Sequence, residues 1–271
     1  MTAAPFALDA ALRALLWVAG LALATWVVSL ARRDVSIVDS LWGPMIALTA
    51  WAYALLAPQT GPREMLVLGL ASLWAVRLSG HVTWRNWGQG EDRRYQAIRA
   101  RNQPSFQYKS LYLVFGLQAC LAWVVALPLM AALAGDRPLG WLDGLGAALW
   151  LFGLGYEALA DWQLARFKAD PAHAGQVMDR GLWAWSRHPN YFGESLVWWG
   201  AWLVAVAAGA AWTVVSPVLM TVLLLRVSGV ALLEKDMTER RPAYRDYMAR
   251  TSAFVPWPPR RHAPAIREAA P

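Results

Sequence analysis

Residues 186–194 read Ser-Arg-His-Pro-Asn-Tyr-Phe-Gly-Glu, a short segment rich in side chains that can bind ligands or transfer protons. Apolar stretches flank it on both sides, and polar groups at a membrane boundary are costly unless they are partnered or bind something. Asn190 offers amide donors and an acceptor, which suit a carboxamide or the edge of a sugar. The segment therefore predicts a cofactor site. The alternative is a helix cap at Asn190 beside an interfacial Tyr191.

Pro189 bears on where a helix can begin in this segment. Pro189 restricts the conformation of the residue before it, so we expect no helix at His188–Pro189. Gly193 permits a tight backbone, and the next apolar span is predicted to begin there. Amide groups at the start of that helix would attract anionic or carbonyl groups.

Ionisable residues inside or at the ends of apolar spans are the second signal. A charge in hydrocarbon costs at least roughly 2.5–3.5 kcal/mol, so each one needs a partner or a wet cavity. Seven of them lie toward the same predicted end of their spans, which favours one polar pocket open to the cytoplasm over scattered interhelical ion pairs. They are Asp39, Arg77, Glu157, Asp161, Glu194, Arg226 and Glu234.

Glu157 and Asp161 are four residues apart and share one helix face, so cations or hydrogen-bond donors must converge on them. The nearby cations are Arg166, Lys168 and Arg187. The same helix contains Gly-Leu-Gly-Tyr-Glu-Ala at 153–158, which resembles a dinucleotide fingerprint but follows no strand. We interpret its glycines as positions of close helix packing.

The segment after Glu234 alternates charged and aromatic residues. One interpretation is a lid whose arginines neutralise phosphates while its tyrosines cover a bound cofactor. A solvated interfacial helix is the alternative. The candidate residues of this lid are Arg240, Tyr244, Arg245 and Tyr247.

Composition and hydropathy indicate an all-α integral membrane protein. The chain is 58% apolar and 16% charged, and its charges are clustered, unlike those of a soluble domain. Seven runs approach the length needed to cross a bilayer: 7–31, 36–57, 65–84, 111–134, 141–165, 193–209 and 213–233. We expect a single domain over residues 1–257 and a frayed tail over residues 258–271.

The basic residues predict the orientation. The connecting segments 32–34, 85–110 and 166–192 and the tail after Glu234 hold 2, 6, 4 and 8 Lys or Arg residues, whereas the other loops hold Arg63 and Arg137 alone. This alternation places the N-terminus outside and the C-terminus in the cytoplasm. The net charge of +7 is then a topology signal, and no nucleic-acid partner is expected.

Cysteine and histidine usage predicts neither a disulfide nor a metal site. The single Cys120 lies in the middle of a span, so the chain has no disulfide of its own. The histidines show no metal-ligand spacing; they are His81, His173, His188 and His262.

Several motifs resemble a known family. Ser186–Glu194, together with Tyr244, Tyr247 and Phe254–Pro256, is similar to the C-terminal domain of the steroid 5α-reductase family. Two further segments resemble a bacterial branch of that family, carried as a domain of unknown function. They are Val38–Gly43 and Leu73–Tyr95, the latter through Leu-Trp-Ala-Val-Arg, Trp-Arg-Asn and Glu-Asp-Arg-Arg-Tyr.

The resemblance implies seven transmembrane helices, bound NADPH, and reduction of a carbon–carbon double bond conjugated to a ketone in a lipidic substrate that enters from the bilayer. Hydride would pass to the β-carbon while an acidic group polarises the carbonyl oxygen. Asn190 and Glu194 match positions near the nicotinamide, Asp161 matches a nucleotide-binding Asp, and Lys168 replaces a phosphate-contacting Arg. The other cofactor residues implied are Arg187, His188, Tyr191, Arg240, Tyr244, Arg245 and Tyr247.

The chain departs from that family where a steroid ketone would be held. Asp39 falls near a Gln-Glu pair, and it could serve as a carboxylic acid kept protonated by an apolar site. Trp74 falls near a tyrosine that it cannot replace as a proton donor. Glu157 aligns with an asparagine. Asp39, Trp74 and Glu194 are thus the candidate catalytic residues, and the departures leave a steroid substrate open.

Two other functions remain as alternatives. Membrane methyltransferases of the isoprenylcysteine and phospholipid type share Arg-His-Pro-x-Tyr-x-Gly, where His and Tyr cradle S-adenosylmethionine, and Glu234 could belong to their downstream acidic segment. A non-enzymatic lipid-binding or assembly protein is the third class. The family branch points to a multi-pass protein of the bacterial inner membrane.

Overall fold

The structure is a computed structural model, and it describes residues 6–57, 61–227, 229–230, 234 and 237–260. These residues form helices and connecting turns with no β-strand among them; a single bridge pairs Ser186 with Ser252. The chain divides into two compact units. Unit 1 comprises residues 1–150 and 199–217, and unit 2 comprises residues 151–198 and 218–271.

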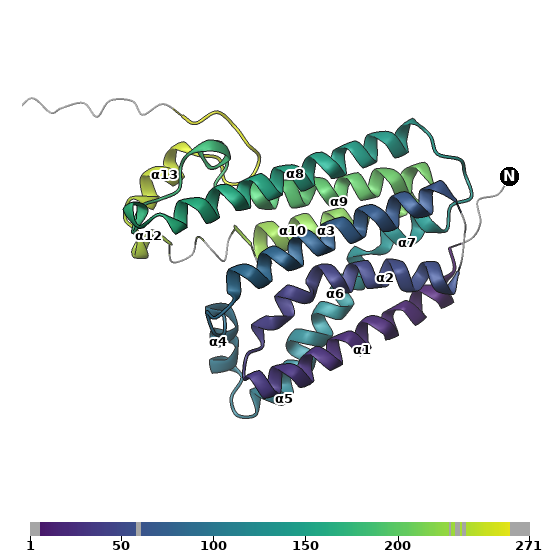
Figure 1. Cartoon of the computed structure of the whole chain (residues 1–271), viewed down its shortest axis with the longest axis horizontal. Coiled ribbons are helices and arrows are strands. Elements are labelled where there is room, and N and C mark those ends of the chain that lie inside the picture. Colours follow the sequence, from purple (N-terminus) through teal and green to yellow (C-terminus); the bar gives the residue numbers. More distant parts are fainter. Residues whose placement is uncertain (1–5, 58–60, 228, 231–233, 235–236, 261–271) are drawn as a thin grey trace, which may run out of the picture. The chain divides into compact units, whose positions relative to one another are not determined.

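Unit 1 is built on three helices that run side by side in alternating directions, α1 (Leu8–Arg32), α2 (Trp42–Leu56) and α3 (Pro62–Asn86) (Figure 1). Helix α6 packs on α1 and α2. The remaining elements of this unit are η1 (Ser36–Leu41), α4 (Arg93–Arg101), α5 (Phe106–Ser110), η2 (Leu111–Gly116), α6 (Leu117–Val125), α7 (Leu127–Leu133) and η5 (Ala211–Val214).

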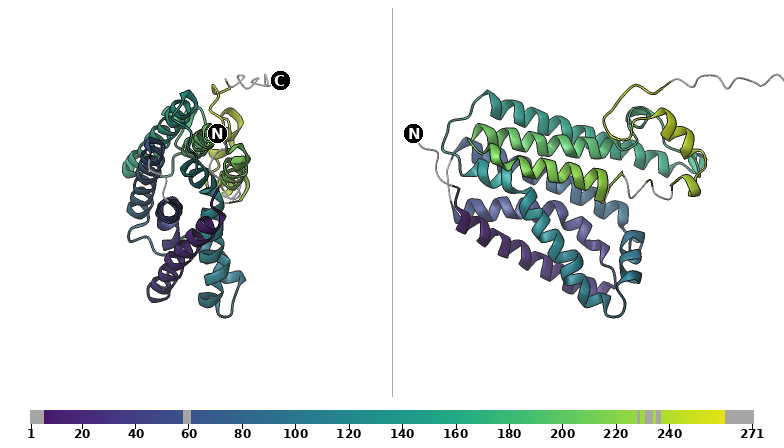
Figure 2. Two further views of the ribbon diagram at one scale, coloured as in Figure 1. Left: turned by 90° about the vertical axis from the view of Figure 1, so that its right-hand side faces the viewer. Right: turned by 180° about the vertical axis from the view of Figure 1, so that it is seen from behind.

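Unit 2 holds most of α8 (Trp141–Ala169) and the first half of α9 (Pro189–Ala207), which lie side by side (Figures 1 and 2). Helix α10 (Val215–Val222) begins in unit 1 and continues in unit 2. Short elements complete unit 2: η3 (Pro171–His173), η4 (Gly181–Ala184), η6 (Leu223–Val227), α12 (Met237–Arg240) and α13 (Tyr244–Arg250).

Among the described residues, three helical stretches are long and apolar enough to cross a membrane: Leu8–Arg32, Pro62–Asn86 and Phe106–Val125. They indicate a membrane protein. The first two agree closely with predicted spans. The predicted span 111–134 is interrupted instead, because the helix ends at Val125 and α7 starts with Pro128 in its first turn, where proline is tolerated. The count of seven spans stays a prediction.

The predicted start of α9 was wrong by one turn. The helix begins at Pro189, because proline is favoured at the first helical position, where its missing N–H has no intrahelical partner. Asn190, Tyr191 and Glu194 are therefore helical residues of the first turns, and Gly193 has a packing role. A Cβ atom on Gly193 would lie 2.6 Å from the backbone nitrogen of Glu157.

Glycines bring α8 and α9 into backbone contact within unit 2. A Cβ atom on Gly153 would lie 2.6 Å from the carbonyl oxygen of Gly193 and 2.8 Å from the nitrogen of Val197. The predicted packing role of Gly153 is thus confirmed. Gly155, predicted to share that role, has no atom within 4 Å of such a Cβ. It is not a packing position.

This difference yields a matched pair of substitutions. Alanine in a helix is intrinsically better than glycine by about 1 kcal/mol, so Gly155→Ala should leave the midpoint of thermal unfolding unchanged or raise it. Gly153→Ala should lower it, because overpacking costs about 1–3 kcal/mol. Circular dichroism of the detergent-purified variants measures both. Equal midpoints would contradict the backbone contact between α8 and α9.

Candidate functional site

Hydrogen bonds to backbone carbonyl groups join the C-terminal segment of unit 2 to residues 183–187. The amide of Arg187 donates to the carbonyl oxygen of Ser252 at 2.9 Å, and the hydroxyl of Ser186 donates to the carbonyl oxygen of Phe254 at 2.8 Å. The hydroxyl of Tyr247 donates to the carbonyl oxygen of Trp183 at 2.5 Å. The tail thus lies against the segment through specific hydrogen bonds, and its role as a lid stays a prediction.

Three side chains of this unit converge on the carboxylate of Glu234. The guanidinium of Arg187 donates to its two carboxylate oxygens at 2.7 and 2.9 Å, and Nε2 of His188 lies 2.9 Å from one of them. The hydroxyl of Tyr244 donates to the same oxygen at 3.3 Å. Burial alone would raise the pKa of Glu234, but the bonds from His188 and Arg187 lower it to about 2. Glu234 is therefore ionised at neutral pH.

All three nitrogen atoms of the Arg187 guanidinium donate hydrogen bonds within the protein. Besides its two bonds to Glu234, its Nη1 donates to the carbonyl oxygens of Thr251 and Met248 at 2.7 and 3.2 Å. Only 10% of its side chain is exposed. These contacts make Arg187 the residue that anchors the tail, and its predicted contact with a cofactor would have to compete with them.

Asn190 joins the first turn of α9 to α8. Its Nδ2 donates to Oδ1 of Asp161 at 3.1 Å. Its Oδ1 is buried and has no hydrogen-bond partner among the described residues. Two further carboxylates of this region, Glu157 and Glu194, are also buried. The structure thus places the predicted residues Asp161, Asn190 and Glu194 on two helices in backbone contact.

The aromatic residues of the site form two groups. The ring of His188 stacks on that of Tyr191, with centroids 5.5 Å apart and planes 4° apart. Tyr244 and Tyr247 meet edge to face and are buried. Burial raises the pKa values of both phenols, so both stay protonated at neutral pH.

The predicted phosphate-contacting cations lie at the surface of unit 2. Lys168 is at the end of α8 and Arg245 is in the first turn of α13, and both are exposed. The side chain of Arg240 is outside the described part of the chain. No cluster of three or more His, Cys, Asp or Glu residues with metal-binding geometry occurs in that described part.

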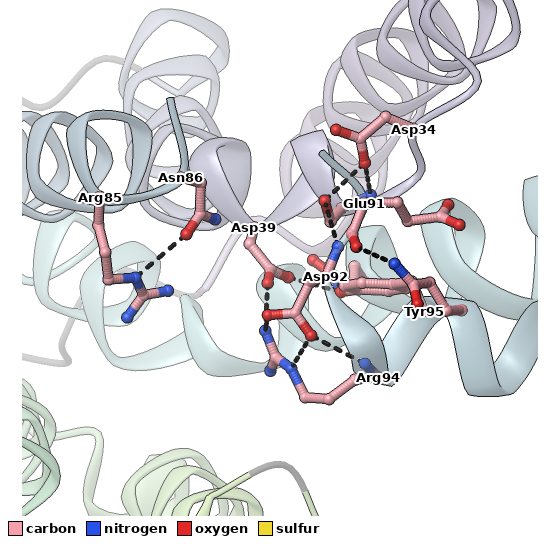
Figure 3. A network of polar contacts seen from close by, with 11 residues as sticks. Asp34, Asp39, Arg85, Asn86, Glu91, Asp92, Arg94 and Tyr95 are labelled. Carbon is pink, nitrogen blue, oxygen red and sulfur yellow. Dashed lines mark hydrogen bonds and ion pairs between the residues drawn. The ribbon is translucent and has the colours of Figure 1, made fainter. Parts of the chain in front are cut away.

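The two predicted catalytic residues of unit 1 have different surroundings. Trp74 is buried in α3. Asp39 lies in η1, where its carboxylate accepts a bond from Nη2 of Arg94 at 2.6 Å and one from the hydroxyl of Tyr95 at 2.5 Å (Figure 3). The expectation of an apolar site around Asp39 is therefore wrong, because the carboxylate is paired with Arg94.

Sequence reasoning missed the partners of these carboxylates. Arg94 and Tyr95 belong to the motif Glu-Asp-Arg-Arg-Tyr at 91–95, and that run of charges directly after a span was the available signal. Gln118, which donates to the hydroxyl of Tyr95 at 3.0 Å, had no signal beyond being an amide in an apolar run. The pairing of Glu234 with Arg187 spans 47 residues, and no local pattern marks it.

The pKa of Glu234 predicts a pH-dependent stability. A carboxyl group with a lowered folded-state pKa stabilises the fold above its unfolded pKa, near 4.5, and this contribution is lost as the pH falls toward about 2. At pH 7, Glu234→Gln should lower the free energy of unfolding by up to about 3 kcal/mol. The difference from wild type should shrink below about pH 4. Thermal unfolding against pH measures it, and a difference independent of pH would contradict the ion pair.

Comparisons with known proteins place the chain in a family without assigning an activity. An uncharacterized protein of Schizosaccharomyces pombe is 29% identical over 268 residues, which cover 85% of this chain and 75% of the relative. No solved structure matches the chain. The model of the family described as "Protein of unknown function (DUF1295)" matches residues 25–251, and the chain belongs to this family.

Proposed function

We propose that the protein is an NADPH-dependent membrane oxidoreductase that reduces a carbon–carbon double bond conjugated to a ketone in a lipidic substrate. The resemblance of Ser186–Glu194 and the tail to the steroid 5α-reductase family supports this proposal. The apolar helices support a substrate that arrives from the bilayer. In this proposal the chain crosses the bacterial inner membrane seven times, with its N-terminus outside and its C-terminus in the cytoplasm.

The observation that carries the proposal is the side chain of Asn190. A buried acceptor without a donor costs about 1–3 kcal/mol, and Oδ1 of Asn190 has no donor among the described residues. The other end of the same amide is fixed by its bond to Asp161. The carboxamide of a nicotinamide ring carries an NH₂ group that can donate to Oδ1. The residues present thus fit the cofactor.

Asn190, Asp161, Glu194 and Tyr191 would hold the cofactor at its nicotinamide and ribose end. The exposed cations Lys168 and Arg245, with Arg240, would neutralise its phosphates. When bound, NADPH supplies the hydride that adds to the β-carbon of the substrate. Arg187, His188, Tyr244 and Tyr247 keep the tail against segment 186–194 through Glu234 and backbone carbonyls, which would exclude water from the site.

For Asp39 and Trp74, which belong to unit 1, we propose a role toward the carbonyl group of the substrate rather than toward the cofactor. Because both oxygens of Asp39 are engaged by Arg94 and Tyr95, Asp39 would act by positioning these two side chains. The buried indole of Trp74 would supply apolar surface. This assignment replaces the protonated carboxylic acid expected from the sequence.

A methyltransferase is the second candidate, and one observation favours it. His188 stacks on Tyr191 and contacts Glu234, which are the residues that the methyltransferase pattern would bring around S-adenosylmethionine. The identity of the bound small molecule separates the two candidates.

The first test is to purify the protein in mild detergent, denature it and identify released small molecules by mass spectrometry. Wild type should release NADP(H). Asn190→Ala should release at least about ten-fold less, because it removes the amide that joins Asp161 to the nicotinamide. Asn86→Ala, whose side chain only accepts a bond from the neighbouring Arg85, is the control. Release of S-adenosylmethionine or its demethylated product would overturn the reductase.

A second prediction separates substrate from cofactor. Asp39→Asn should leave the affinity for NADPH unchanged, because the proposed cofactor residues all belong to unit 2. It should slow NADPH consumption with lipidic enones at least about ten-fold, since the anion that holds Arg94 and Tyr95 is lost. Fluorescence titration and a turnover assay measure the two effects. Loss of NADPH binding would place Asp39 in the cofactor site instead.

A further inference from the structure

Gln118 is an amide side chain within a helical stretch long enough to cross a membrane, Phe106–Val125. A π-helical turn, η2, directly precedes α6 and shifts the register of its side chains. Such turns are rare and occur often at functional sites. The neighbouring residues Leu117 and Cys120 are exposed, so this stretch of α6 is on the outer surface of unit 1. Polar side chains at such positions need a partner.

One end of the amide is held by a chain of hydrogen bonds. Nε2 of Gln118 donates to the hydroxyl oxygen of Tyr95 at 3.0 Å. That hydroxyl donates its single proton to Asp39 at 2.5 Å, and Asp39 is paired with Arg94. Figure 3 shows Asp39 between Arg94 and Tyr95. The phenol can therefore only accept from Gln118, which fixes which end of the amide faces Tyr95.

The other end of the amide has no donor. Oε1 of Gln118 is buried, and no described residue donates to it. Tyr95 cannot supply a proton, since its own is in the bond to Asp39. Turning the amide over would set its NH₂ group where Oε1 lies and leave two acceptors facing each other at Tyr95. A donor for Oε1 must therefore come from a bound molecule.

We infer that this corner of unit 1, defined by Gln118, Tyr95, Asp39 and Arg94, binds the hydroxyl group of a lipid. A hydroxyl can donate to Oε1 of Gln118, whereas a ketone or an ester has no proton to donate. An ammonium group is disfavoured by the neighbouring cation Arg94. Gln118 lies in an apolar helical stretch that is long enough to cross a membrane. The molecule that carries the hydroxyl is therefore a lipid alcohol. This site shares Asp39, Arg94 and Tyr95 with the carbonyl site of the proposed reduction, but it adds Gln118 and requires no cofactor.

A matched pair of probes tests the inference in detergent solution. Oleyl alcohol and its methyl ether differ by the hydroxyl proton, and a sterol and its 3-methyl ether form a second such pair. Binding is followed by tryptophan fluorescence. In wild type, at least one alcohol should bind about ten-fold or more tightly than its ether, because the ether leaves the buried acceptor unpaired.

Gln118→Leu should remove this preference, because leucine has a similar size and no acceptor. Gln89→Leu, at an exposed loop position, should keep it. Equal binding of alcohol and ether to wild type would overturn the inference and mean that water alone meets Oε1. A preference that survives in Gln118→Leu would also overturn it. Gln118→Met gives a second variant if the first fails to fold, and the wild-type comparison needs no variant.

Discussion

A charge or a polar group that leaves water for an apolar helical protein must find a partner, and in unit 2 the partly buried carboxylate of Glu234 shows what this requires. Arg187, His188 and Tyr244 all contact it. The same guanidinium bonds backbone carbonyls of the tail, so one cation both neutralises the carboxylate and holds the tail against segment 186–194. In the proposed function, this contact keeps the tail against the segment that holds the cofactor.

The same constraint works differently in unit 1. Asp39 is paired with Arg94 and Tyr95. The hydroxyl of Tyr95 in turn accepts a hydrogen bond from Gln118. There the chain of bonds ends in an acceptor with no donor among the described residues. In unit 2, Oδ1 of Asn190 is likewise a buried acceptor with no donor among the described residues. Within the described part of the chain, Gln118 in unit 1 and Asn190 in unit 2 are thus each held at one end of the amide and present a free acceptor at the other. The two ligand proposals rest on these two acceptors.

Close helix packing is what allows the polar residues of unit 2 to meet. Glycines at 153 and 193 let α8 and α9 approach until their backbones touch, and Asn190 then reaches Asp161 from the next helix. Side chains larger than hydrogen at these positions would separate the two residues. Packing at two glycines therefore has a direct consequence for the geometry of the candidate site.

The sequence by itself determined the helical class, the spans that became α1 and α3, and the segment in which the candidate cofactor residues gather. The length of an apolar run, its composition and the clustering of polar residues depend on residues that are close in sequence, so they can be recognised from the sequence alone. Only the tertiary structure decided that Arg187 is paired with Glu234 and that Asp39 is half of an ion pair. These outcomes depend on residues distant in sequence, whose contacts form only when the helices pack.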